Sequence, residues 1–299
     1  MIIVNDFYSQ MPDLHALRHA LRSFAQSPSP FQIINSFPSQ PAQLTRPTNT
    51  LYILDSSFNP PTLAHLSICT SALLHDKRED TSQPRLLLLL ATQNADKAPK
   101  PAAFEQRLAM MSIFAENLQT KIHLESGGSM GNVGVDVGVT KVPRFVEKVD
   151  AIENSGSFSA PEGVQGPVEQ VHLIGFDTLV RLLDTKYYPP DHTLQPLNRL
   201  FAKGRVRVTR RTEDAWGGGN EQVQYVRSLA EGRIEGDGGK KEWAEKIELV
   251  EGRPNGEEII SSTKVRNAAK NANKGALEKL VTRNVASWIL DEKLYMDED

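Results

Sequence analysis

The sequence predicts an α/β protein in which a parallel β-sheet is covered by helices on both faces. Short apolar runs of strand length alternate with segments of helical periodicity. Most of these runs are apolar on both faces, as expected for parallel strands buried between two helical layers. The chain has 299 residues, 39% hydrophobic and 24% charged, which permits a substantial core and argues against global disorder.

Strands are expected at short segments that are rich in apolar residues. The clearest run is LLLLLA at residues 86–91, where the short length and the helical pattern that follows favour a strand. An edge strand is expected at residues 31–34, inside a proline-rich segment. The other strands are expected at residues 51–55, 121–125, 171–175, 205–210 and 246–250.

Helices are expected between these strands and near both ends of the chain. In the segment 13–26, Leu14, Leu17, Leu21 and Phe24 lie on one helical face. The other helices are expected at residues 62–75, 102–118, 177–184, 262–271 and 284–292, with a further one within 220–229.

Three stretches interrupt this alternation. Residues 126–138 are rich in glycine, residues 153–170 in serine, glycine and proline, and residues 212–241 contain two glycine clusters. These stretches are interpreted as surface insertions between core elements. We therefore expect an N-terminal helix and proline-rich lead-in over residues 1–48, followed by a single domain with insertions over residues 49–299.

Composition excludes several classes of protein. The single cysteine, Cys69, cannot form an internal disulfide, which excludes a disulfide scaffold and indicates a reducing compartment. The net charge of −3 gives no electrostatic footprint for nucleic acid. No apolar run approaches the roughly 20 residues of a membrane span.

The start of the sequence bears on the compartment. It lacks the basic start and apolar stretch of a secretory signal. The arginine-bearing helix expected at 13–26 leaves a mitochondrial presequence open, but Asp6 and Asp13 argue against it. We expect the protein to be located in the cytoplasm, the nucleus or both.

The first candidate site is the segment DSSFNPPTLAH at residues 55–65, which follows a buried strand and opens a helix. Such a junction presents free backbone N–H groups and the positive end of a helix dipole, which suit phosphate. Thr62 and His65 lie three residues apart, so their side chains share one helix face. The plainer alternative is a turn and helix cap with His65 as a satisfied core histidine, and it is the commoner outcome for an isolated histidine.

The second candidate site is the segment IISSTKVR at residues 259–266. Three hydroxyl residues precede a helix that Ser261 or Ser262 can cap. Arg266 follows Ser262 by four residues, so it lies on the same helix face and can chelate phosphate oxygens. One such helix start could be an ordinary cap, but two of them, each with a cationic or hydrogen-bonding side chain, favour anion binding.

These two motifs resemble those of the nicotinamide mononucleotide adenylyltransferase family, within the nucleotidyltransferase superfamily that carries an (H/T)-x-G-H motif. Residues 56–65 are similar to G-S-F-N-P-x-H-x-G-H, and residues 260–266 match I-S-S-T-x-x-R. Ser56, Thr62 and Ala64 depart from the first signature, whereas its final histidine is retained. The resemblance looks closest to a divergent fungal branch and implies the Rossmann-like, doubly wound nucleotidyltransferase fold.

The resemblance implies how the first motif acts on ATP. His65 and the backbone of Ser57 and Phe58 would hold the α-phosphate region, with Thr62 nearby. Asp177 belongs to a segment that resembles the family's G-x-D element and would bind a ribose hydroxyl or another polar group.

The resemblance also implies roles for the second motif and for the acceptor. Ser262, Thr263 and Arg266 would neutralise the β- and γ-phosphates and the leaving pyrophosphate. Lys97 and Asn59 would bind the mononucleotide. Mg²⁺ would be carried mainly by phosphate oxygens.

Plain structural roles also fit some polar residues. Asp177 could cap the helix that follows it, and Lys97 could be a solvated lysine in a proline-rich loop. Arg144 and Lys148 lie four residues apart on an expected helix and are interpreted as surface charges.

The implied reaction transfers the adenylyl group of ATP to nicotinamide mononucleotide, giving NAD and pyrophosphate without a covalent intermediate. Two alternatives stay open. One is a relative within the superfamily that uses another phosphorylated acceptor, or CTP. The other is a nucleotide-binding regulatory protein with weak ATPase activity, whose insertions would contact partners.

Overall fold

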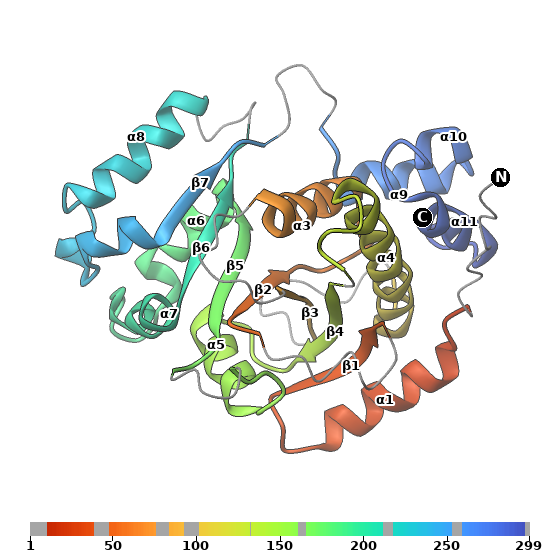
Figure 1. The fold of residues 1–299 in the computed structure, drawn as a ribbon, viewed down its shortest axis with the longest axis horizontal. Helices are drawn as coiled ribbons and strands as arrows, with labels where there is room; N and C mark the ends of the chain where they lie inside the picture. The colour runs from red at the N-terminus through yellow and green to blue at the C-terminus, as the bar shows by residue number, and fades with distance from the viewer. Residues whose placement is uncertain are drawn as a thin grey trace.

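The computed structural model describes residues 11–38, 48–75, 84–92, 102–131, 133–160, 166–211, 218–252 and 259–296. These residues form one seven-stranded sheet between two layers of helices (Figure 1). In spatial order the strands are β1 (Phe31–Phe37), β4 (Gly134–Thr140), β3 (Arg85–Ala91), β2 (Thr50–Asp55), β5 (Glu169–Gly175), β6 (Gly204–Thr209) and β7 (Ile247–Val250).

The sheet is parallel from β4 to β7, and only the edge strand β1 is antiparallel to its neighbour. The chain runs outward from β2 to β3 and β4, then returns to β5 beside β2 and continues to β6 and β7. The strand order therefore reverses between β2 and β5. In doubly wound sheets, ligands bind outside the carboxyl ends of the strands at this switch point. The predicted doubly wound fold is confirmed.

The helices divide between the two faces of the sheet (Figure 1). The alternation of side chains along β2 shows both layers, because Tyr52 and Leu54 pack on one face and Leu51 and Ile53 on the other. The first face carries α1 (Leu14–Gln26), α3 (Leu63–His75), α4 (Phe104–Glu125), α9 (Ser262–Lys270), α10 (Lys274–Leu277) and α11 (Arg283–Asp291). The second face carries α5 (Phe145–Asn154), α6 (Phe176–Leu182), α7 (Asn198–Lys203) and α8 (Gly219–Ala230).

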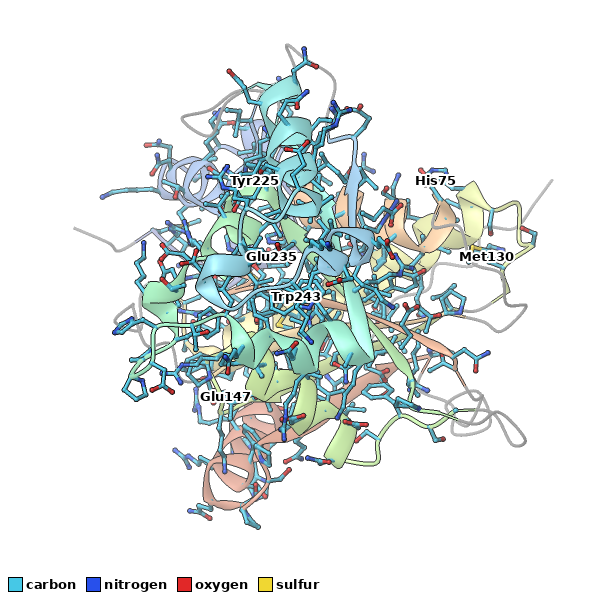
Figure 2. The ribbon with its side chains drawn as sticks, turned by 90° about the vertical axis from the view of Figure 1, so that its left-hand side faces the viewer. His75, Met130, Glu147, Tyr225, Glu235 and Trp243 are labelled. Carbon is cyan, nitrogen blue, oxygen red and sulfur yellow. The ribbon has the colours of Figure 1, made fainter. Side chains whose placement is uncertain are left out.

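Among the described residues, four 3₁₀ helices complete the second layer: η1 (Thr185–Tyr187), η2 (Gln195–Leu197), η3 (Glu235–Asp237) and η4 (Lys241–Lys246). Trp243 of η4, which Figure 2 labels, stacks on Phe201 of α7, with 4.8 Å between ring centroids. Tyr225 of α8, also labelled there, packs edge-on against Phe176, at 5.4 Å. The helix predicted within residues 220–229 is thus present as α8, and it packs on the core.

One strand and one insertion were predicted wrongly. Residues 121–125, expected as a strand, form the end of α4, where Ile122 is buried one turn after Leu118. The strand is instead β4, which occupies part of the stretch 126–138 that was expected as an insertion. Its glycine has a packing role, because a Cβ on Gly138 would lie 2.9 Å from Leu87 Cδ1. Glycine content suggested a loop, whereas close packing requires the glycine here.

The N-terminal segment joins the same core. Asp13 caps α1 by accepting from the backbone N–H of His15 at 2.8 Å, and Leu17 and Phe24 are buried against the sheet layer. The edge strand predicted at residues 31–34 is confirmed as β1, which pairs with β4. Within the described residues, no helix is long and apolar enough to cross a membrane.

Candidate active site

The loop between β2 and α3 begins at the switch point. Ser56 donates its backbone N–H to the carbonyl of Leu89 at 3.2 Å, which continues the sheet contact past the end of β2. Ser57 is exposed, whereas the Phe58 ring is fully buried and its backbone has φ +44°. This left-handed conformation costs about 1–2 kcal/mol for a residue with a Cβ. Burial of the phenyl ring offsets that cost, so packing fixes the loop before any ligand arrives.

His65 lies in the first turn of α3, and both ring nitrogens are engaged. Its Nδ1 accepts the backbone N–H of Thr62 at 2.9 Å, and the Thr62 hydroxyl lies 2.9 Å from the same nitrogen. Because Nδ1 accepts, the ring proton belongs on Nε2, which lies 3.1 Å from Ser56 Oγ. Burial lowers the pKa of His65 to about 4. At neutral pH His65 is therefore an uncharged hydrogen-bond donor directed at the loop.

The start of α9 contacts the same loop. Ser261 caps the helix by accepting from the backbone N–H of Lys264 at 3.3 Å. The Ser262 hydroxyl donates to the carbonyl of Pro60 at 2.9 Å. Two helix N-termini that are about 200 residues apart in the chain thus lie side by side, as the two motifs predicted.

Arg266 is fixed between the two motifs. Its Nη1 donates to the carbonyl of Asn59 at 2.9 Å, and its Nη2 donates to the Thr263 hydroxyl at 3.1 Å. Thr263 is exposed and Arg266 is half-buried. The guanidinium therefore combines a fixed position with access to solvent, which is what an anion-binding arginine requires.

Tyr295, which the sequence gave no reason to select, belongs to this site. Its hydroxyl donates to Asn59 Oδ1 at 2.9 Å and lies 4.0 Å from the sulfur of Met110 on α4. Asn59 is buried, and its side-chain oxygen accepts this hydrogen bond from Tyr295. No local pattern around residue 295 marks it, because the contact spans 236 residues.

Asp177 lies at the carboxyl end of β5, across the switch point from the first motif. Its Oδ1 is 3.2 Å from Arg211 Nε, and its Oδ2 is 3.8 Å from Arg181 Nη2. The backbone N–H and carbonyl of Arg211 are both bound by the buried side chain of Gln222, at 3.1 and 2.6 Å. A Cβ on Gly175 would lie 2.8 Å from Asp177 Oδ1, which explains the glycine of the G-x-D segment.

Lys148 was interpreted as a surface charge, and this is wrong. It is 4% exposed, and its Nζ pairs with Asp55 Oδ2 at the end of β2. The same Nζ lies 5.5 Å from the centre of the Phe145 ring. The helical spacing was right, but the face of α5 that carries Lys148 turns toward the switch point. The pair neutralises a carboxylate that lies directly before the loop of the first motif.

Lys97 lies outside the described residues, so its predicted contact with the mononucleotide stays a prediction. A cavity of about 400 Å³ lies between α1 and α4. Thr92 and Lys141, which follow β3 and β4, line it together with Arg18, Arg22 and Phe104. This cavity lies at the carboxyl edge of the sheet, as the two motifs do.

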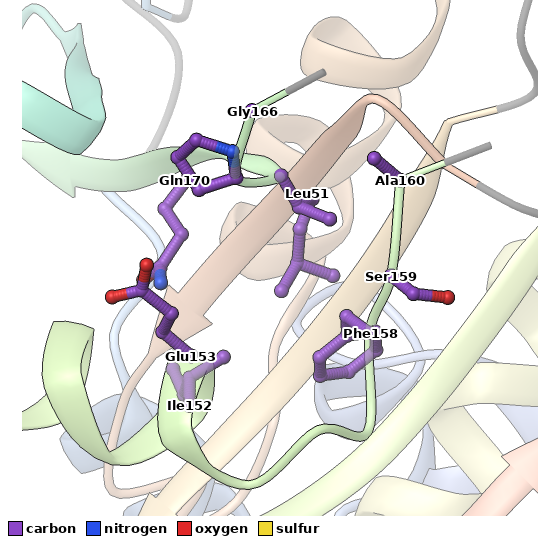
Figure 3. A pocket seen from close by; sticks show the side chains of 10 residues that line it. Leu51, Ile152, Glu153, Phe158, Ser159, Ala160, Gly166 and Gln170 are labelled. Atoms are coloured by element: carbon purple, nitrogen blue, oxygen red, sulfur yellow. The ribbon is translucent and has the colours of Figure 1, made fainter. Parts of the chain in front are cut away.

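A second cavity, of about 180 Å³, lies at the opposite edge (Figure 3). Leu51 and Gln170, near the amino ends of β2 and β5, line it together with Ile152 and Phe158. This cavity and the two motifs therefore lie at opposite ends of the strands.

The doubly wound sheet, with two adjoining helix starts at its switch point, has the architecture of an α/β nucleotide-binding protein. No family model matches the chain. A curated protein of Schizosaccharomyces pombe, named "Putative nicotinamide mononucleotide adenylyltransferase", is 34% identical over 239 residues, which cover 80% of this chain and 83% of that protein. The chain belongs to the nicotinamide mononucleotide adenylyltransferase family, as the motifs implied.

Solved structures support the fold. The nicotinic acid mononucleotide adenylyltransferase of Plasmodium falciparum in complex with NaAD is 12% identical, with a TM-score of 0.51 over 83% of this chain and 97% of that chain. The same enzyme in complex with APC aligns with a TM-score of 0.52, at the same identity and coverage. At this identity the likeness concerns the fold alone.

Proposed function

We propose that the protein transfers the adenylyl group of ATP to nicotinamide mononucleotide, giving NAD and pyrophosphate. The family supports the class of reaction. The single observation that carries the proposal is the junction of the two motifs, where Ser262 binds the Pro60 carbonyl and Arg266 binds the Asn59 carbonyl, each at 2.9 Å. This junction places two helix N-termini, one imidazole N–H and one guanidinium around a single site for phosphates.

In the proposed reaction an oxygen of the mononucleotide phosphate attacks the α-phosphorus of ATP. The new P–O bond forms as the bond between the α-phosphorus and the bridging oxygen breaks, and pyrophosphate leaves with that electron pair. The attacking phosphate has its second pKa at about 6, so it is already anionic at neutral pH and needs no general base. Catalysis then depends on positioning and on stabilising charge.

Each residue of the junction has a defined part in this proposal. His65 donates its Nε2 proton to an oxygen on the α-phosphorus, where negative charge develops. Thr62 holds the imidazole in the tautomer that makes this possible. Arg266 and the hydroxyls of Ser262 and Thr263 bind the leaving pyrophosphate.

Mg²⁺ stays part of the proposal as an ion bound through ATP. The site offers hydroxyls and cations, and Asp55, the carboxylate nearest the loop, is paired with Lys148. Among the described residues, no group of three histidine, cysteine or acidic side chains is placed to hold a metal. The phosphate oxygens would supply the ligands, and the bound ion would neutralise phosphate charge.

We place the acceptor on the side of the cavity between α1 and α4. Arg22 and Lys141 line that cavity, and their positive charges suit a phosphorylated acceptor. Phe104 and Leu21 supply apolar wall for a ring.

The test is a two-substrate assay with purified protein, ATP, Mg²⁺ and nicotinamide mononucleotide, in which dinucleotide and pyrophosphate are both measured. We expect both products in equal amounts and a loss of about 10²- to 10³-fold in rate for His65→Ala, because a donor to the transition state is removed. His75→Ala, at the exposed end of the same helix, is the matched control. Absence of product above the His65→Ala level would contradict the proposal.

Further arms separate the alternatives. Nicotinic acid mononucleotide, other phosphorylated acceptors and CTP test the choice of substrate. Phosphate release from ATP without transfer to any acceptor would instead support a regulatory protein with weak ATPase activity.

A further inference from the structure

Arg107, in the first turn of α4, is a buried cation that pairs with no carboxylate of the described residues. It is 7% exposed, its Nε donates to the carbonyl of Ala102 at 2.8 Å, and its guanidinium lies 5.1 Å from the centre of the Phe104 ring. Within the part of the chain that the structure describes, Arg107 forms no ion pair. Burying a charge without a counter-charge is costly, so the arrangement requires an explanation.

The other buried charges show that this is unusual for the molecule. Lys148 pairs with Asp55, and Arg207 pairs with Glu248 at 3.1 Å. The neutral contacts of Arg107, one carbonyl and one aromatic face, leave its positive charge uncompensated by the described residues.

Arg107 lies beside the junction of the two motifs. Met110 follows it by one helical turn and contacts Tyr295, whose hydroxyl binds the side chain of Asn59. Arg266 binds the carbonyl of the same asparagine. The α4 face with Arg107 and the α9 face with Arg266 therefore approach one loop from two sides.

The electrostatics agree with this placement. Burial lowers the pKa of the Arg107 guanidinium, Tyr295 raises it, and the nearby charge of Arg266 lowers it further. The two positive guanidinium groups repel each other, and one anion placed between them would stabilise both.

We propose that Arg107 is a phosphate-binding residue that contacts the β- and γ-phosphates of ATP from the α4 side, opposite Arg266. This inference rests on the proposed function, since it takes the junction to be the ATP phosphate site. It adds a third segment, α4, to the two helix starts that the motifs identified. A triphosphate supplies enough negative charge to compensate both guanidinium groups.

The test measures nucleotide binding by calorimetry without any acceptor. We expect Arg107→Gln to weaken ATP binding by about 10- to 100-fold, which corresponds to one hydrogen bond to a charged group. Arg107→Lys retains the positive charge, so its affinity for ATP should fall less than that of Arg107→Gln. AMP, which lacks the β- and γ-phosphates, should bind all variants nearly equally.

A structural role would give a different result. Arg207→Gln also removes a buried arginine, and it should lower the melting temperature without changing the ratio of ATP to AMP affinity. If Arg107→Gln and Arg107→Lys behave like this control, or weaken ATP and AMP equally, the inference is overturned. Should Arg107→Gln not fold, the ATP to AMP ratio of Arg107→Lys decides. Because no transfer is measured, a protein that binds ATP but makes no dinucleotide would count against the proposed function alone.

Discussion

Replacing Lys148 with methionine tests whether its buried ion pair with Asp55 stabilises the strand end that leads into the first motif. The two side chains are 5% and 12% exposed, so removing the ammonium leaves a carboxylate in a poorly solvated position. Breaking a buried pair from one side costs about 3–5 kcal/mol. A chain of this size loses about 2–4 °C of melting temperature for each kcal/mol, so we expect a loss of about 6–20 °C.

The assay is a double-mutant cycle measured by urea unfolding of the natural chain, Asp55→Asn, Lys148→Met and the double variant. The double variant removes both charges, so it should be more stable than Lys148→Met alone. Lys148→Met should also weaken ATP binding, because an uncompensated carboxylate then lies directly before the phosphate-facing loop. If the two single effects add to within about 0.5 kcal/mol, the residues are not coupled and the reasoning is refuted.

Three further predictions concern other parts of the fold. Burial, with a smaller contribution from a nearby lysine, lowers the pKa of His172 to about 3, so the unfolded chain binds more protons between pH 6.5 and 3 and stability falls as pH falls through that range. His172→Leu should remove up to about 1.4 kcal/mol per pH unit of this slope near pH 5 in urea unfolding, and an unchanged slope would contradict it. Gly204→Ala should destabilise the sheet by several kcal/mol, because the added Cβ would lie 1.9 Å from a backbone oxygen of β5. Gly236→Ala is the control, because the space around Gly236 is open. Equal melting temperatures of the two variants would refute the argument. Tyr295→Phe should lower the free energy of unfolding by about 1 kcal/mol and weaken ATP binding several-fold, because Asn59 loses its hydrogen bond to Tyr295. Unaltered ATP affinity would show that this hydrogen bond does not support the site.

The parts of the fold that the sequence predicted are those whose local pattern matches their environment. The runs at 51–55 and 86–91 are apolar on both faces because both faces of β2 and β3 are buried. β4 has the sequence GVDVGVT, and its buried Asp136 is explained only by Arg85 and Ser36 from neighbouring strands. No local rule predicts a buried aspartate, so tertiary contacts decided the strand.

The candidate site divides in the same way. His65 and Arg266 were found because helix starts with hydroxyl and cationic residues have a local signature. Arg107 and Tyr295 lie in ordinary helical and C-terminal sequence, and Lys148 looked like one member of a surface pair. Their importance depends on which distant loop they contact, and that is a property of the folded chain.

The hydrogen bonds that fix the loop of the first motif can form only after residues 262, 266 and 295 have been synthesised. The loop at Asn59 and Pro60 is synthesised before its three partners, which follow it by 202, 207 and 236 residues. Contacts of such long sequence separation form slowly, because closing a long loop of chain costs conformational entropy. All seven strands of the sheet are therefore synthesised before α9, which completes the junction of the two motifs. Under the proposed function, ATP can assist only the stage of folding that follows the synthesis of α9.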